Sequence, residues 1–225
     1  MTGLIAALDT ADPAQAAAWA DVLAPHCGLL KLGLEFVLAC GPGAVRGVTQ
    51  RPVFLDLKLH DIPNTVAGAV RAVLPLRPRM LTLHAGGGGA MMEAARRAVE
   101  GPDRPTLLAV TVLTSLDSSA LHATGVAGGP RQQVLRLARL ALQSGADGIV
   151  CSAQEAAMLR DALGAGPVLV VPGIRPTGAA MADQARTMTP RDAMDAGADW
   201  IVVGRPITGS PDPAAAAAAI AAELA

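Results

Sequence analysis

A short cluster of charged residues, Asp56 to Asp61, carries the clearest chemical signal in the sequence. It reads DLKLHD and follows an apolar run, Pro52 to Leu55, that has the composition of a buried strand. Because side chains alternate between faces along a strand, Asp56 and Lys58 are predicted to point the same way, with Asp61 close enough to join them. Such grouped charges are costly to desolvate and are typical of a functional site. The alternative is a surface ion-pair cluster, which contributes little to stability.

Short apolar runs that alternate with helical stretches must position this cluster. Eight such runs occur, at residues 4–8, 28–32, 53–57, 80–83, 107–112, 148–151, 168–171 and 200–203. Segments able to form helices follow them, for example 13–23, 90–99, 132–143 and 213–224. Near-continuous apolar strands suit a parallel sheet buried on both faces, and eight β/α units suit a closed barrel. The sequence therefore predicts an α/β fold, a single (β/α)8 TIM barrel that forms one domain over residues 1–225.

The first β/α turn argues against the main alternative, a doubly wound open sheet. That fold needs a glycine-rich turn after its first strand. The turn here is Asp9-Thr-Ala-Asp12 and contains no glycine. No linker or low-complexity segment divides the chain, so we expect no second domain.

Composition excludes several classes of function. The net charge is −1 and no basic run occurs, which argues against a general binder of nucleic acid or membrane surfaces. The first ten residues lack the positive flank and the length of a signal peptide, and the alanine-rich stretch 214–225 is too short to span a bilayer. The three cysteines, Cys27, Cys40 and Cys151, fit no metal or disulfide spacing. We therefore expect a cytoplasmic protein.

Polar residues follow most of the predicted strands. They are Asp9, Lys31, Asp56 with Lys58, His84, Thr111 with Thr114, Ser152, and Gly204 with Arg205. The carboxyl ends of all strands in a β/α barrel open on one face, where active sites lie. Any one of these residues could be a helix cap, but their shared position predicts a site at this face.

The last two β/α units indicate a phosphate site. Val171 to Arg175 leads into a long polar loop, 176–190, and the eighth run ends in Gly204-Arg205-Pro206. Barrels often bind phosphate between the loops after strands seven and eight. Gly204 permits close approach of the backbone, and Arg205 can make a bidentate contact. An ordinary strand-to-helix turn would also explain Gly-Arg-Pro.

Separate motifs, in the same order, resemble the bacterial branch of the orotidine 5′-phosphate decarboxylase family. They are Leu8-Asp9, Lys31-Leu-Gly33, Asp56 to Thr65 (DLKLHDIPNT), Val112-Leu-Thr-Ser115, Val171 to Pro176 (VPGIRP), Asp183-Gln184 and Gly204 to Thr208 (GRPIT). The resemblance implies cofactor-free conversion of orotidine 5′-phosphate to uridine 5′-phosphate and CO₂ in pyrimidine biosynthesis, with no metal. The chain has no Tyr, whereas some members use an aromatic contact near the phosphate.

The resemblance also implies roles for the matched residues. Lys58 would stabilise a carbanion at C6 of the pyrimidine and protonate it, held by Asp56 and Asp61, while Lys31 extends the charge array. The substrate-binding residues would be Asp9, Lys31, Asp56, Thr65, Thr114, Arg175, Gln184, Gly204 and Arg205. A two-fold homodimer is implied, in which Asp61 and Thr65 reach into the neighbour's site. The implied partner molecule is a nucleotide, and we expect neither a nucleic acid nor a membrane as a partner.

Two other functions remain open for the D-x-K-x-x-D signature. Relatives that share it stabilise an enediolate with Mg²⁺ and place Glu after the second strand, where this chain has Lys31. Lys31 and Lys58 together would repel a dication. A non-catalytic sensor of nucleotide phosphates could use the same barrel, because a fold does not prove an activity. Such a sensor could dispense with Lys58, which this chain keeps.

Overall fold

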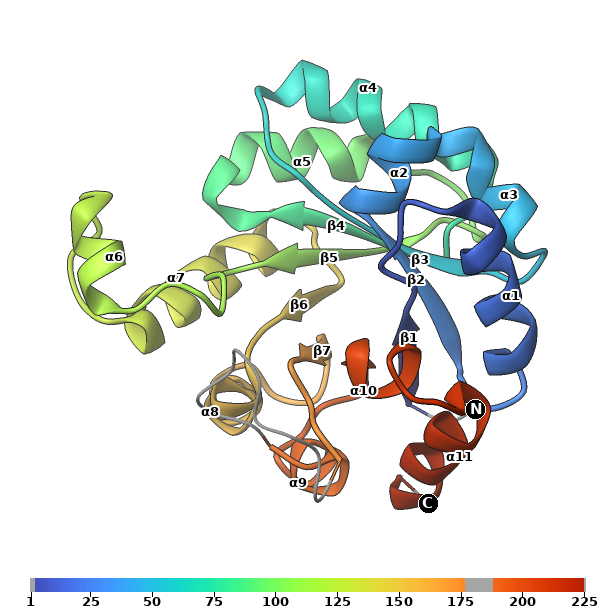
Figure 1. The fold of residues 1–225 in the computed structure, drawn as a ribbon. Coiled ribbons are helices and arrows are strands. Elements are labelled where there is room, and N and C mark those ends of the chain that lie inside the picture. The colour runs from blue at the N-terminus through green and yellow to red at the C-terminus, as the bar shows by residue number, and fades with distance from the viewer. Residues whose placement is uncertain (1–2, 177–187, 225) are drawn as a thin grey trace.

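The computed structural model describes residues 3–176 and 188–224. Eight parallel strands form a closed barrel in chain order, surrounded by helices (Figure 1). The strands are β1 (Leu4–Ala7), β2 (Leu29–Gly33), β3 (Val53–Leu59), β4 (Met80–His84), β5 (Thr106–Val110), β6 (Gly148–Val150), β7 (Val168–Pro172) and β8 (Trp200–Val203). Because β1 pairs with both β2 and β8, the sheet is closed. The prediction of a (β/α)8 barrel is confirmed.

Helices connect the strands on the outside of the barrel. The α-helices are α1 (Pro13–Leu23), α2 (Leu34–Cys40), α3 (Val45–Val48), α4 (Pro63–Val73), α5 (Gly89–Arg97), α6 (Ser118–Ala123), α7 (Pro130–Gln143), α8 (Ala153–Leu163), α9 (Pro190–Asp195), α10 (Arg205–Thr208) and α11 (Pro213–Glu223). Three 3₁₀ turns are η1 (Pro42–Ala44), η2 (Leu74–Leu76) and η3 (Ala85–Gly87). None of the helices in these two described ranges is long and apolar enough to cross a membrane.

Local sequence explains where several helices begin. The carboxylate of Asp12 accepts hydrogen bonds from the backbone N–H groups of Ala14 and Gln15, and Pro13 opens α1. The same Asp-Pro pair, Asp212 and Pro213, opens α11. Aspartate satisfies free N–H groups at a helix start, and proline has no N–H to leave unpaired there.

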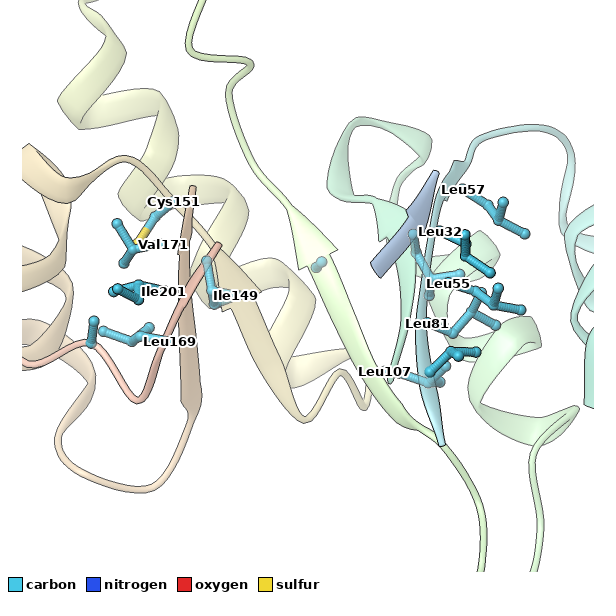
Figure 2. Packing of buried hydrophobic residues seen from close by; sticks show 14 of the residues in the cluster. Leu32, Leu55, Leu57, Leu81, Leu107, Ile149, Cys151, Leu169, Val171 and Ile201 are labelled. Carbon is cyan, nitrogen blue, oxygen red and sulfur yellow. The ribbon is translucent and has the colours of Figure 1, made fainter. Parts of the chain in front are cut away.

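Two sets of apolar side chains hold the barrel together. The larger set packs the strands against the helices and includes Leu55, Leu81 and Ile201 (Figure 2). The smaller set comes from the strands alone and fills the inside of the barrel; its members are Ile5, Ala7, Leu29, Phe54, Met80, Leu108, Val170 and Val202. Seven of the eight strands contribute to this inner set, and Val150 of β6 packs against it while partly buried. The strands are thus covered on both faces, which explains the near-continuous apolar runs of the sequence.

Candidate active site

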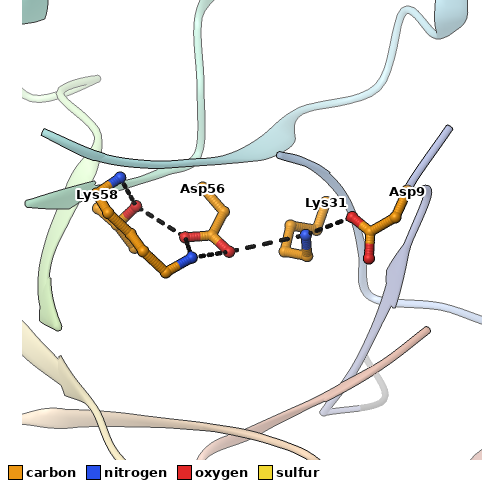
Figure 3. A network of polar contacts seen from close by, with 5 residues as sticks. Asp9, Lys31, Asp56 and Lys58 are labelled. Atoms are coloured by element: carbon orange, nitrogen blue, oxygen red, sulfur yellow. Dashed lines mark hydrogen bonds and ion pairs between the residues drawn. The ribbon is translucent and has the colours of Figure 1, made fainter. Parts of the chain in front are cut away.

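Four charged side chains form a row across the carboxyl ends of β1, β2 and β3 (Figure 3). Lys31 Nζ lies 2.9 Å from Asp9 Oδ1 and 3.7 Å from Asp56 Oδ2. Lys58 Nζ donates hydrogen bonds of 2.8 Å to both carboxylate oxygens of Asp56. The row alternates in sign, so each charge is next to an opposite one. The site residues predicted for the first three strands are thus brought together.

Burial makes these charges depend on one another. The side chain of Lys31 is 9% exposed, that of Asp56 16% and that of Lys58 33%. Burial by itself raises the pKa of Asp56, but the charges of Lys31 and Lys58 and the hydrogen bonds from Lys58 and Thr82 outweigh it. The net effect lowers the pKa of Asp56 below its usual value, so this carboxylate stays ionised at neutral pH.

The end of β3 is not a regular strand. Its register with β4 shifts between Leu55 and Leu59, and Lys58 has a φ of 47°, in the left-handed region. This conformation costs a residue with a Cβ on the order of 1–2 kcal/mol. Asp56 and Lys58 do share one side of the chain, as predicted, although regular strand alternation is not the reason.

Thr82, which belongs to none of the sequence motifs, fixes this irregular end. Its hydroxyl accepts a 2.9 Å hydrogen bond from the backbone N–H of Lys58 and donates one of 3.0 Å to Asp56 Oδ1. Thr82 is 1% exposed. The one sign of this role in the sequence is that Thr82 is the single polar residue inside the apolar run Met80 to Leu83.

Gly33 is a second residue whose role emerges only from the structure. A Cβ atom at this position would lie 3.1 Å from Lys31 Nζ and 3.5 Å from Asp9 Oδ1. Glycine therefore leaves room for the ammonium group between its two carboxylates. The sequence motif contained Gly33, but nothing in the sequence showed that its missing side chain makes this space.

Three members of the charge row line a cavity of about 210 Å³. Its charged lining is Lys31, Asp56 and Lys58, and Thr114 lies on the rim. The remaining lining is mostly apolar, consisting of Phe54, Val110, Val112, Leu113, Val150, Cys151, Val170, Pro172 and Val202. A larger cavity of about 360 Å³ lies at the other end of the barrel, beside Cys27, Arg51 and Trp200, away from the charge row. The smaller cavity, which is lined by members of the charge row, is therefore the candidate active site.

Of the predicted phosphate residues, Gly204 lies beside Asp9. A Cβ on Gly204 would lie 3.7 Å from Asp9 Oδ2, and Arg205 begins α10. Arg175 is half-buried, and its backbone N–H donates a 3.2 Å hydrogen bond to the carbonyl of Met188. Asp183 and Gln184 lie outside the described residues.

Asp61 and Thr65 are not part of the charge row of their own chain. Both are exposed beyond the end of β3. The carboxylate of Asp61 accepts a 2.6 Å hydrogen bond from the backbone N–H of Ile62. Among the described residues, the Asp61 carboxylate forms no ion pair with Lys58. The expectation that Asp61 joins Asp56 and Lys58 is therefore not met within one chain.

The donor set of the site suits ammonium groups better than a metal. The described part of the chain holds no group of three or more His, Cys, Asp or Glu side chains placed to bind a metal ion. Lys31 occupies the space between Asp9 and Asp56, where a dication would need to lie. Two nearby ammonium groups would repel such an ion.

A parallel barrel with a charged cavity at its carboxyl end is the arrangement typical of β/α-barrel enzymes. Its family follows from sequence: the chain belongs to the orotidine 5′-phosphate decarboxylase / HUMPS family, whose model matches residues 2–220. It is 57% identical to orotidine 5′-phosphate decarboxylase of Gluconobacter oxydans over 230 residues, which cover 100% of this chain and 98% of that one. It is 59% identical to the enzyme of the same name from Anaeromyxobacter dehalogenans over 223 residues, covering 98% and 97%.

Solved structures agree with this assignment. The crystal structure of orotidine 5′-phosphate decarboxylase from Lactobacillus acidophilus matches with a TM-score of 0.88 and 37% identity, covering 100% of this chain and 99% of that one. The protein of the same name from Pyrococcus horikoshii matches with a TM-score of 0.81 and 25% identity, covering 98% of each chain.

Proposed function

We propose that this protein converts orotidine 5′-phosphate to uridine 5′-phosphate and CO₂ in pyrimidine biosynthesis, without a cofactor. The observation that carries the proposal is the alternating row Asp9, Lys31, Asp56 and Lys58, the last three of which line the cavity. The proposal includes a cytoplasmic location and one domain over residues 1–225.

The reaction needs a cation held at C6 of the pyrimidine. When the bond from C6 to the carboxylate breaks, its electron pair stays on C6, and no adjacent carbonyl delocalises it. Stabilisation must then be electrostatic, from a charge already in place. Lys58 supplies that charge, transfers a proton from Nζ to C6, and regains a proton from water.

Asp56 has two roles in this proposal. It holds the ammonium of Lys58 through two 2.8 Å hydrogen bonds. Its lowered pKa keeps it ionised beside the substrate carboxylate, so the two like charges repel each other until CO₂ leaves. Lys31 limits the cost of burying this carboxylate, because it lies 3.7 Å away.

The order of residues around the barrel matches the order of groups in the substrate. Gly204 and Arg205 would bind the phosphate, with Arg175 and Gln184 from the loop after β7. Asp9, beside Gly204, would bind the ribose hydroxyls together with Lys31. Thr114, on the rim of the cavity, would contact the pyrimidine edge. With the groups bound in this order, C6 would lie near Lys58, which supports the proposed role of this lysine.

A homodimer would complete the site. Asp61 and Thr65 are exposed and point to no partner within their own chain's charge row. Large apolar side chains are exposed at the same end of the barrel: Leu38 on α2 is 79% exposed and Ile62, next to Asp61, 67%. A two-fold interface over this end would bury these side chains and bring each Asp61 and Thr65 to the neighbour's site.

Turnover by the purified protein in excess EDTA tests the proposed reaction. We expect the absorbance of orotidine 5′-phosphate to fall at an undiminished rate, because the charge row needs no metal. Loss of turnover in EDTA with recovery in Mg²⁺ would support a metal-dependent enzyme. Binding of uridine 5′-phosphate without any turnover would support a sensor.

Replacement of Arg205 by alanine tests the phosphate assignment. We expect kcat/KM for orotidine 5′-phosphate to fall by about 10²-fold, because a charge-assisted contact to a non-reacting group is lost. Orotidine without phosphate should be a poor substrate for the wild type and lose little further on this change. Arg139→Ala, an exposed arginine on α7, is the matched control. Equal losses for both substrates would argue against a phosphate-specific role.

A further inference from the structure

Two histidines stack beside the irregular end of β3. The rings of His60 and His84 have centroids 5.0 Å apart and planes inclined by 7°. Strand pairing brings the two rings together, because Leu59 of β3 pairs with Leu83 of β4 and each histidine is the next residue in its chain segment. The proposed reaction uses neither ring.

The turn after β4 holds the stack in place. His84 Nδ1 accepts a 3.1 Å hydrogen bond from the backbone N–H of Gly86, which caps η3. Burial, and then the charges of His60 and Lys58, lower the pKa of His84, so its ring is neutral near pH 7 and can accept this bond. A Cβ on Gly87 would lie 3.1 Å from His60 Cδ2, so the turn packs closely against the second ring.

The histidine stack lies next to Lys58 along the chain. His60 lies between Lys58, whose left-handed φ is unfavourable, and Asp61, which leaves the barrel toward solvent. β4 therefore contacts this turn twice, through Thr82 at the backbone N–H of Lys58 and through His84 at the ring of His60. A strained conformation persists only where surrounding contacts determine it.

We propose that His60 and His84 are positioning residues, which brace the left-handed turn and thereby hold the Lys58 ammonium on Asp56. The inference rests on the proposed function, because it assigns the pair to the same reaction. This positioning role requires no contact between either ring and the substrate. They act through the backbone between Lys58 and Asp61.

Alanine variants of both histidines and a phenylalanine variant of His60 test this inference by kinetics. His60→Ala and His84→Ala should lower kcat by about 10- to 100-fold, since a small misplacement of a reacting group is costly. Affinity for uridine 5′-phosphate, measured by calorimetry, should stay within about threefold, because the binding groups are intact. His60→Phe keeps a stacking ring without a titrating group and should restore most of kcat. If the two rings act as one unit, the kcat of the double alanine variant should be no lower than that of the less active single variant.

His26→Ala is the matched control, because His26 precedes β2 at the opposite end of the barrel, and its kcat should equal that of the wild type. An unchanged kcat in His60→Ala, or a parallel loss of kcat and nucleotide affinity, would overturn the bracing role. A crystal structure of His60→Ala gives a readout that needs no turnover. We expect the Lys58 ammonium beyond ion-pair distance of Asp56; an unmoved Lys58 would overturn the inference even if the wild type were inactive.

Discussion

Replacing Lys58 with alanine is expected to lower turnover by about 10³-fold or more while the barrel stays folded. The change removes the only ammonium that is hydrogen-bonded to both oxygens of Asp56 among the described residues. No other cation in the proposed mechanism is placed to stabilise C6 and to protonate it. Steady-state decarboxylation, followed by absorbance, gives the loss.

A second variant, Lys58→Gly, separates chemistry from backbone strain. Glycine adopts a positive φ without the steric cost that alanine keeps at this position. Lys58→Gly should therefore be as inactive as Lys58→Ala, although its melting temperature should equal or exceed that of Lys58→Ala. Circular dichroism and binding of uridine 5′-phosphate check that both variants are folded. Activity within about tenfold of the wild type in either variant would rule out Lys58 as the proton donor.

Subunits carrying Lys58→Ala and Asp61→Ala are expected to restore activity when they are mixed. Each homodimer should be nearly inactive. In a mixed dimer one site carries both changes, whereas the other combines Lys58 of one chain with Asp61 of its partner. Random reassortment makes about half of the dimers mixed, so roughly a quarter of all sites should recover. Activity measured after dissociation and reassociation provides the test.

The control for this experiment is the same mixing with two Lys58→Ala populations, which should recover nothing. Subunit exchange must be verified independently, for example by mass spectrometry of differently tagged chains. Verified exchange without recovery would mean that Asp61 serves the site of its own chain. That result would contradict the shared site and leave the exposed position of Asp61 without a functional reason.

The sequence predicted the barrel because its strands are buried on both faces. Such strands are apolar over most of their length, and most of the polar residues gather toward their carboxyl ends. The ends of parallel strands meet on one face, so Asp9, Lys31 and Asp56 could be placed together without coordinates. Strand ends were less certain: the fifth run was predicted to reach Val112, but β5 ends at Val110.

The contacts between neighbouring strands could not be predicted from one sequence. The support that Thr82 gives Lys58 depends on the register of β4 against β3, which shifts just there. The left-handed Lys58 breaks the alternation on which the prediction relied, and lysine has no special preference for that conformation. The need for glycine at position 33 depends on where the Lys31 ammonium lies, 3.1 Å from the place that a Cβ would take.

The charge row has one consequence for how this protein can be studied. Lys31 and Lys58 are the only two lysines in the 225 residues, since every other residue counted as Lys or Arg is arginine. Arginine does not lose its proton in proteins, whereas a lysine can. Apart from the terminal amine, every amine that a selective reagent can reach therefore lies in this row. Lysine labelled with ¹³C at Cε should give two side-chain resonances, one for each ammonium of the site.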